Sequence, residues 1–151
     1  MHFPGDNDAL RGRRVLVIED EMLVVMEFES VLQAHGCVVV GPAASIEQAS
    51  VLLHEQRPDV ALMDLNLNGQ SALPVAAAMR EKAVPFVLVT GYSESRSAEP
   101  ELRQAPRLPK PVRHRALLRT LAEILTSTPP VQQAGTDDVS GRAAEPQALT
   151  E

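Results

Sequence analysis

The sequence predicts an α/β fold in which a five-stranded parallel sheet is doubly wound, with helices on both faces. Five short apolar runs alternate along the chain with segments whose apolar residues recur at helical spacing. Each run is bounded by glycine, proline or polar residues, which is typical of strands buried on both faces of a parallel sheet. Short connections and right-handed crossovers then place helices on both faces of that sheet.

The five strands follow from these apolar runs. Turn residues delimit them: Gly41-Pro42 closes the second run, Arg57-Pro58 precedes the third, and prolines flank the fifth. In chain order the strands are predicted at Val15–Ile18, Cys37–Val40, Asp59–Met63, Pro85–Val89 and Arg107–Leu108.

The first two helices lie between strands. One is predicted from Glu21 to His35, with Gly36 as the residue just past its end. Ser45 is the N-cap candidate of the next helix, which Pro58 ends. The two apolar faces consist of Val24, Phe28, Val31 and Leu32, and of Ile46, Ala49, Ser50 and Leu53.

The remaining helices differ in how much they can bury. After an Asn68-Gly69 turn, apolar spacing predicts a helix from Ala72 to Ala83, with Pro74 in its first turn. Residues 92–105 offer only Leu102 as a large apolar side chain, so the fourth helix is expected to be short or frayed. The last helix ends near Thr126 and buries Leu117, Leu121, Ile124 and Leu125.

The composition predicts one folded domain with two tails. The chain has 151 residues, of which 44% are hydrophobic but only 3% aromatic, so aliphatic side chains must fill the core. Residues 1–12 are expected to form a flexible N-terminal tail, and residues 127–151 a disordered C-terminal tail. The folded domain is therefore expected to span residues 13–126.

Charge and cysteine content argue against several classes of function. The net charge of -6 disfavours nucleic-acid binding, which requires a basic face. Cys37 is the single cysteine, so neither a disulfide nor a thiolate metal site can form within the chain. No apolar run approaches the ~20 residues that span a bilayer, and no signal peptide is visible. We therefore expect no membrane association and a cytoplasmic location.

Polar residues follow the ends of four predicted strands, and parallel strands bring their carboxyl ends to one edge of the sheet, where ligands bind. These residues are Glu19, Asp20, Asp64, Thr90 and Lys110. Three carboxylates at close range raise one another's pKa values unless a cation neutralises them. An all-oxygen set suits Mg²⁺, and the backbone carbonyl of Asn66, two residues past Asp64, is a further candidate ligand.

The same set suits phosphoryl transfer to Asp64. A carboxylate can attack phosphorus and form an acyl phosphate, provided that the charge on the phosphoryl oxygens is neutralised. Lys110 would supply a cation and Thr90 a hydroxyl donor. Each residue alone has a simpler explanation: Asp20 as a helix cap, Thr90-Gly91 as a turn and Lys110-Pro111 as a helix start. Their joint occurrence, in this order and at one edge, favours the functional interpretation.

With these residues in place, the sequence resembles the receiver domain of two-component response regulators over residues 13–126. The resemblance implies a flavodoxin-like sheet of order 2-1-3-4-5 and a cis peptide bond at Lys110-Pro111. It also implies that Asp64 is phosphorylated by a sensor histidine kinase or a histidine phosphotransfer protein. Mg²⁺ would be bound by Asp20, Asp64 and the Asn66 carbonyl, with Glu19 helping through water.

Two departures refine this resemblance. Gly91-Tyr92 follows Thr90, which is similar to a Thr-Gly subgroup of stand-alone receivers linked to HWE histidine kinases, although Leu88-Val89 departs from that subgroup's Phe-Ala. Arg107 stands where many receivers carry an aromatic switch residue, so a coupled threonine–aromatic switch is in doubt. Activation is instead expected to order residues 92–105, predicted to be the most mobile part of the domain.

The resemblance therefore predicts a single-domain response regulator that acts as a switch, shuttle or sink, with only Mg²⁺-dependent self-phosphorylation and self-dephosphorylation as intrinsic chemistry. A downstream protein would bind the face of residues 92–105, the fifth strand and the last helix. Two alternatives stay open: a non-phosphorylated pseudo-receiver that only binds a partner, and an aspartate-nucleophile phosphatase. The phosphatase usually needs a second acid two residues after its nucleophile, where this chain has Asn66.

Overall fold

The computed structural model describes residues 9–91, 102 and 104–127. Its main sheet is parallel, five-stranded and ordered β2-β1-β3-β6-β7, which is the predicted order 2-1-3-4-5. The flavodoxin-like arrangement is therefore confirmed. The strands are β1 (Arg14–Ile18), β2 (Val38–Ala43), β3 (Val60–Asp64), β6 (Phe86–Thr90) and β7 (Arg107–Pro109).

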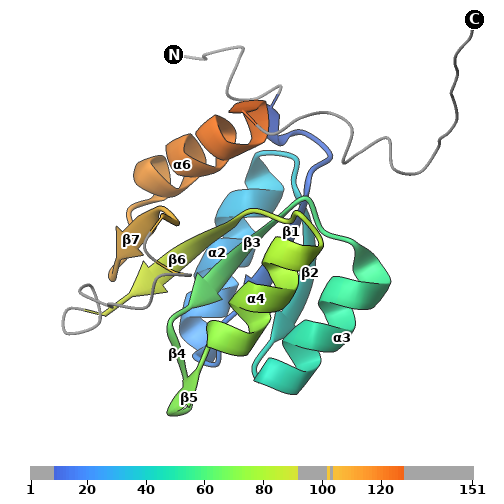
Figure 1. Cartoon of the computed structure of the whole chain (residues 1–151). Helices are drawn as coiled ribbons and strands as arrows, with labels where there is room; N and C mark the ends of the chain where they lie inside the picture. The colour runs from blue at the N-terminus through green and yellow to red at the C-terminus, as the bar shows by residue number, and fades with distance from the viewer. Residues whose placement is uncertain (1–8, 92–101, 103, 128–151) are drawn as a thin grey trace, which may run out of the picture.

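Helices cover both faces of this sheet (Figure 1). On one face lie α2 (Met22–Ala34) and α6 (His114–Ser127), and on the other lie α3 (Ile46–Gln56) and α4 (Leu73–Glu81). Alternate residues of each strand serve opposite faces: Val15 and Val17 pack under α2 and α6, whereas Leu16 and Ile18 pack under α3 and α4. Burial on both faces explains why the strands are continuous apolar runs.

The helix caps confirm two local predictions. The Ser45 hydroxyl accepts a hydrogen bond from the backbone N–H of Gln48 at 3.1 Å, so it caps α3 as expected. Gly36 has φ +85° just past the C-cap of α2, a left-handed conformation that favours glycine. The predicted cis peptide bond at Lys110-Pro111 is also present.

The predicted apolar faces are largely confirmed, but single positions differ in three helices. In α2 the fully buried residue is Val25, while Val24 packs only partly against the core. In α6, Ala122 is buried and Ile124 is half-buried, and in α3, Ser50 is exposed. These positions lie at the margins of the apolar stripe, where the packing partner rather than the period decides which side chain is buried.

β2 is longer than predicted, because Gly41-Pro42 does not close it. β2 lies at the edge of the sheet, where proline is tolerated since one side of the strand has no partner. Gly41 has φ +96°, and a Cβ there would lie 3.0 Å from the Ala43 nitrogen and 3.2 Å from the Val17 carbonyl oxygen. Glycine is thus required where β2 passes β1 with an irregular register.

Two segments between β3 and β6 differ from the prediction in detail. The Asn68-Gly69 turn closes a small antiparallel hairpin of β4 (Asn66–Leu67) and β5 (Gln70–Ser71). Both turn residues have positive φ, as the favoured two-residue hairpin turns require. The following helix ends at Glu81, and Ala83, predicted to lie in it, is exposed with φ +59°.

The expected N-terminal tail is wrong for its last residues, since Ala9 and Leu10 are buried. Leu10 belongs to the core under α2 and α6, and its carbonyl accepts hydrogen bonds from Arg13 N–H and the Cys37 thiol. One leucine in a polar stretch has no periodicity, so the sequence pattern did not reveal it.

Most of the segment 92–105 and the residues after Ser127 lie outside the described part of the chain. The predictions of a short fourth helix, a mobile segment 92–105 and a disordered C-terminal tail fall on these residues. Leu102 is buried against the core under α3 and α4.

Candidate functional site

The carboxyl ends of neighbouring strands bring the predicted site residues to one edge of the sheet. Glu19 and Asp20 follow β1, Asp64 ends β3, and Thr90 ends β6. Asp64 is in register with Val89, so Thr90 lies one residue further along the adjacent strand. Lys110 follows β7, and its backbone N–H donates to the Thr90 carbonyl at 2.9 Å.

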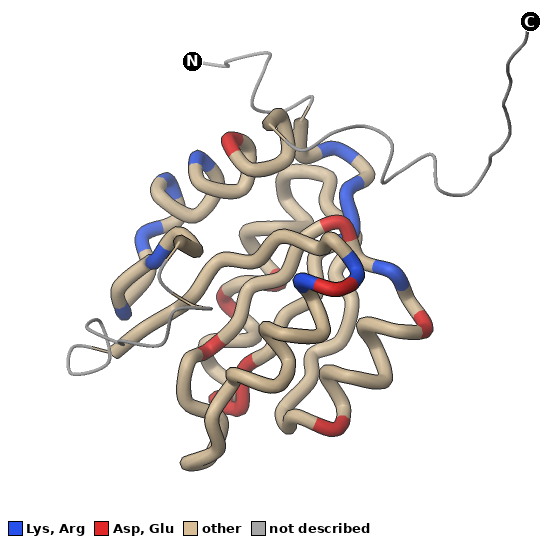
Figure 2. Tube along the Cα trace, viewed as in Figure 1, with Lys and Arg blue, Asp and Glu red and all other residues tan. Residues whose placement is uncertain are grey.

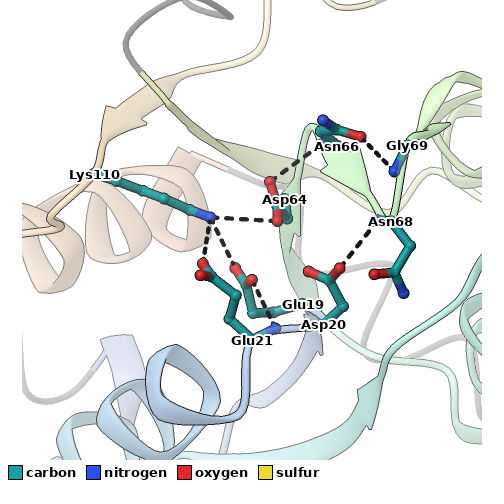
Figure 3. Close-up of polar contacts among 8 residues, drawn as sticks. All are labelled: Glu19, Asp20, Glu21, Asp64, Asn66, Asn68, Gly69 and Lys110. Atoms are coloured by element: carbon teal, nitrogen blue, oxygen red, sulfur yellow. Dashed lines mark hydrogen bonds and ion pairs between the residues drawn. The ribbon is translucent and has the colours of Figure 1, made fainter.

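The Lys110 ammonium lies among three carboxylates (Figure 3). Its Nζ donates to Glu21 Oε1 at 3.2 Å and to Asp64 Oδ2 at 3.3 Å, and lies 3.6 Å from Glu19 Oε1. Glu19 and Asp64 are 2% and 4% exposed, so their interactions with Lys110 are little screened by water. Lys110 is the only cation that contacts these carboxylates in the part of the chain that the structure describes.

Asp20 completes the acidic cluster. Oxygens of Glu19, Asp20 and Asp64 lie within 4.8 Å of one another. Asp20 Oδ2 accepts a hydrogen bond from the backbone N–H of Asn68 at 3.0 Å, so the hairpin turn fixes its carboxylate. Asp20 is not the cap of α2: Glu21 occupies the N-cap position and makes no capping hydrogen bond.

Burial and mutual repulsion dominate the electrostatics of the cluster. Burial, followed by the charge of Asp64, raises the pKa of Glu19 to about 7. Burial also raises the pKa of Asp64, although the Asn66 N–H and Lys110 favour its ionised form. For Lys110, burial lowers the pKa, but the carboxylates of Asp64, Glu19 and Glu21 outweigh it and the net shift is upward.

The cluster fits a bound divalent cation. Glu19 Oε1 is buried without a hydrogen-bond partner, and the pKa values of Glu19 and Asp64 are raised, so one ammonium does not compensate the negative charge. All donors are oxygens, which suits Mg²⁺ or Ca²⁺ rather than a soft metal. Asn66 is tied to Asp64 through its backbone N–H, which donates to Asp64 Oδ1 at 3.1 Å.

The family follows from a comparison with known proteins. The family model named response regulator receiver domain matches residues 15–122 of this chain. The chain belongs to this family. It is a family of signalling domains of two-component systems rather than of classical enzymes, as the sequence predicted.

Similar proteins are regulators that contain such a receiver domain. The chain is 32% identical over 90 residues to the transcriptional regulatory protein PdtaR of Mycobacterium tuberculosis, covering 59% of this chain and 44% of that protein. It is 34% identical over 83 residues to the phyllosphere-induced regulator PhyR of Methylorubrum extorquens, covering 53% and 31%. This chain thus spans less than half of the length of these curated relatives.

The match to this chain covers almost the whole of two similar solved structures. The receiver domain of Erythrobacter litoralis PhyR has a TM-score of 0.69 and 27% identity, covering 80% of this chain and 95% of that one. SdrG from Sphingomonas melonis Fr1 has a TM-score of 0.67 and 30% identity, covering 77% and 98%. Assignment of this receiver to the Thr-Gly subgroup stays a prediction.

Thr90 is the member of the receiver set that makes the fewest contacts. Its side chain is 1% exposed, and within the described residues no hydrogen bond joins its hydroxyl to Asp64 or Lys110. It is therefore close to the cluster through its place at the strand end rather than through a direct bond.

Sequence reasoning missed two contacts at the receiver site. Glu21 was the start of a predicted helix and was not among the predicted site residues, yet its carboxylate accepts a hydrogen bond from Lys110. Asn68 was read only as a turn residue, yet its N–H holds Asp20. The sequence carried a weak signal for Glu21, as the third of three successive carboxylates, and none for the Asn68 contact, which depends on where the hairpin packs.

Arg107 occupies the position where many receiver domains have an aromatic residue. Its guanidinium donates to the Leu102 carbonyl oxygen at 3.2 Å, so it ties β7 to the segment before it. The side chain is half-buried, and the leucine it holds belongs to the core.

No helix of the described residues is long and apolar enough to cross a membrane.

Proposed function

We propose that this chain accepts a phosphoryl group on Asp64 from a sensor histidine kinase or a histidine phosphotransfer protein, and thereby acts as a signalling switch, shuttle or sink. The observation that carries the proposal is the contact of a buried Asp64 with Lys110 beside Glu19 and Asp20. Membership of the receiver family supports it.

The transfer forms one bond and breaks one. An Asp64 carboxylate oxygen attacks phosphorus, the P–O bond forms, and the P–N bond of the donor's phosphohistidine breaks. The imidazole leaves with the electron pair and then takes a proton from solvent. The Asn66 N–H on Oδ1 orients the carboxylate for this attack, which lowers the barrier by positioning.

Lys110 and Thr90 would stabilise the transferred group. After transfer, Lys110 pairs with a phosphoryl oxygen instead of Asp64 Oδ2, and the Thr90 hydroxyl donates to another. Asp20, Asp64 and the Asn66 carbonyl would hold Mg²⁺, and Glu19 would help through water. When bound, Mg²⁺ supplies charge neutralisation around the phosphoryl oxygens.

The donor would approach over the start of α2. Met22, Leu23 and Met26 are 63%, 81% and 55% exposed, although large apolar side chains are usually buried. Met22 and Leu23 directly follow Glu21, and Met26 lies about one turn further along α2, so this surface adjoins the acidic cluster. Leu23→Gln is expected to slow transfer from a histidine kinase that labels the wild-type chain and to leave labelling by acetyl phosphate unchanged. Equal slowing with both donors would contradict this docking surface.

The test of the main proposal is intact mass after incubation with acetyl phosphate, with and without Mg²⁺. We expect a Mg²⁺-dependent, hydroxylamine-labile adduct in the wild type that is absent from Asp64→Asn. Asp59→Asn is the matched control, because the Asp59 carboxylate accepts a hydrogen bond from Arg14 N–H at the other end of β3, and it should retain the adduct. An adduct that persists in Asp64→Asn would refute the assignment of the acceptor.

The two alternatives have less support. A pseudo-receiver that only binds a partner would keep that partner in Asp64→Asn, whereas the phospho-switch would lose signalling. An aspartate-nucleophile phosphatase usually needs an acid two residues after the nucleophile. Asn66 stands there, and its side-chain oxygen accepts a hydrogen bond from Gly69 N–H at 2.9 Å, so it is occupied with the turn.

A further inference from the structure

A cavity of 340 Å³ lies at the opposite edge of the sheet, where β3 begins and α3 and α4 end. Its volume falls within the ~300–1,000 Å³ of small-molecule sites. It is lined by Leu53, His54, Arg57, Pro58, Asp59, Lys82, Ala83 and Val84. None of these residues belongs to the acidic site, so the receiver function does not account for them.

Three nitrogen-bearing side chains line this cavity. Lys82 Nζ lies 3.3 Å from His54 Nδ1, and since an ammonium can only donate, Nδ1 is the acceptor in this contact. Arg57 makes no hydrogen bond or ion pair with any residue of the described part of the chain. The cavity is thus lined by an exposed guanidinium, an ammonium and an imidazole ring.

The backbone of this cavity is strained at two places. Arg57 has φ +50° and Ala83 has φ +59°, and three non-glycine residues in total have positive φ within the described residues. The third, Asn68, belongs to a residue type that tolerates the left-handed region, whereas alanine and arginine do not. Left-handed non-glycine residues are enriched in ligand clamps, because the surrounding structure must hold them there.

We propose that this cavity is a second binding site, for a small molecule that carries a phosphate group. A phosphate offers several acceptor oxygens and a charge that Arg57 and Lys82 can neutralise together. Asp59, on the same wall, repels a second anionic group but accepts hydrogen bonds from a hydroxyl or amine of the ligand. Figure 2 shows basic segments at the ends of α3 and α4 with acidic segments among them, so the ligand must combine an anion with a neutral or cationic part.

The site would be independent of phosphorylation. The cavity contacts the amino-terminal end of β3, whereas Asp64 is its last residue. A ligand there touches Pro58 and Asp59 directly before the strand that carries the acceptor. Binding would therefore be observable in the metal-free, unphosphorylated chain.

The experiment is a titration of the full ¹⁵N-labelled chain with inorganic phosphate, followed by backbone amide shifts in EDTA, with sodium acetate at equal ionic strength as a second series. We expect saturable shifts confined to residues 53–59 and 82–84. Arg57→Asn is the test variant, because asparagine tolerates the left-handed backbone while the guanidinium is lost, and Lys82→Gln is the second. Each should weaken phosphate binding about tenfold, as loss of a charge-assisted hydrogen bond does. Arg119→Gln, an exposed change on α6, should leave it unaltered.

Each outcome of these titrations either supports or overturns the proposed site. Absence of saturable shifts, or equal affinity in Arg57→Asn and Lys82→Gln, overturns the site. Acetate that saturates the same amides as tightly as phosphate overturns the phosphate assignment. A wild-type-like amide spectrum of the unliganded variants shows that they fold, so weakened binding then reports on the site itself.

Discussion

The two edges of the sheet use charge in opposite ways. At the carboxyl edge, Glu19 and Asp64 are nearly fully buried and share the single ammonium of Lys110. At the amino edge, Arg57, Lys82 and His54 are exposed around an open cavity. Strand register places the carboxylates and Lys110, whereas the cations of the amino edge lie at the ends of α3 and α4. The carboxyl edge of the metal-free chain therefore contains electrostatic repulsion, whereas the cations of the amino edge would be brought together only by the proposed ligand.

Removal of the shared cation should have the largest effect. In Lys110→Met, charge on the phosphoryl oxygens loses its partner, and phosphorylation of Asp64 by acetyl phosphate should slow by at least about 100-fold. Lys82→Met, which removes the ammonium of the other edge, should leave the rate unchanged. The measurement is the initial rate of adduct formation by intact mass with saturating Mg²⁺. If both variants slowed equally, the two edges would not be separable in function.

The repulsion itself should appear as a pH dependence of stability. Because the pKa of Glu19 is raised to about 7 in the folded state, the folded protein holds a proton that the unfolded chain has released above pH 4.5. Stability of the metal-free protein should therefore fall as pH rises from 5 to 8, by roughly 2–3 kcal/mol. The raised pKa of Asp64 acts in the same direction, and Lys110 stays charged throughout this window.

Urea unfolding in EDTA at several pH values measures this slope. Glu19→Gln should remove most of it, and Mg²⁺ should oppose it by binding the ionised carboxylates of the folded state. Glu123→Gln is a matched control, since that exposed carboxylate lies near the end of α6, away from the cluster. Stability that rises between pH 5 and 8 without metal would show that Lys110 compensates the cluster after all.

A neutral residue at the carboxyl edge should behave differently from the charged ones. Ser45 follows β2 and caps α3 through the N–H of Gln48. Ser45→Ala should cost about 1 kcal/mol of unfolding free energy, as loss of an N-cap does. The rate of phosphorylation and the pH slope should not change. A changed pH slope in this variant would mean that the pH dependence of stability does not arise from Glu19 and Asp64 alone.

The sequence predicted which residues meet at the carboxyl edge of the sheet, but it did not predict the cavity at the amino edge. Asp64 and Thr90 end strands and Lys110 directly follows one. The carboxyl ends of parallel strands lie at one edge whatever the loops do, so the convergence of these residues follows from topology. The contact of Glu21 with Lys110 depends on the point where α2 begins, which periodicity does not define within a residue or two. The cavity at the amino edge is built from helix ends that each look ordinary, and only the packing of α3 beside α4 brings them together. Leu10 was missed for a similar reason, since its partner Cys37 lies 27 residues away.

The smallest effect concerns the strained backbone of the amino edge. Arg57 ends α3 in a left-handed conformation, which glycine adopts without the Cβ penalty. Arg57→Gly should stabilise the fold by about 0.5 kcal/mol, because relief of strain slightly exceeds the extra entropy of the unfolded chain. The same change removes the guanidinium, so phosphate binding at the cavity should weaken even though the fold becomes more stable. Gly36→Ala is the converse, since it adds a Cβ to a residue with φ +85° and should destabilise the protein by about 1 kcal/mol. Urea unfolding of both variants decides the point: destabilisation by Arg57→Gly would mean that the arginine side chain contributes packing, and that its conformation is not strain held for a ligand.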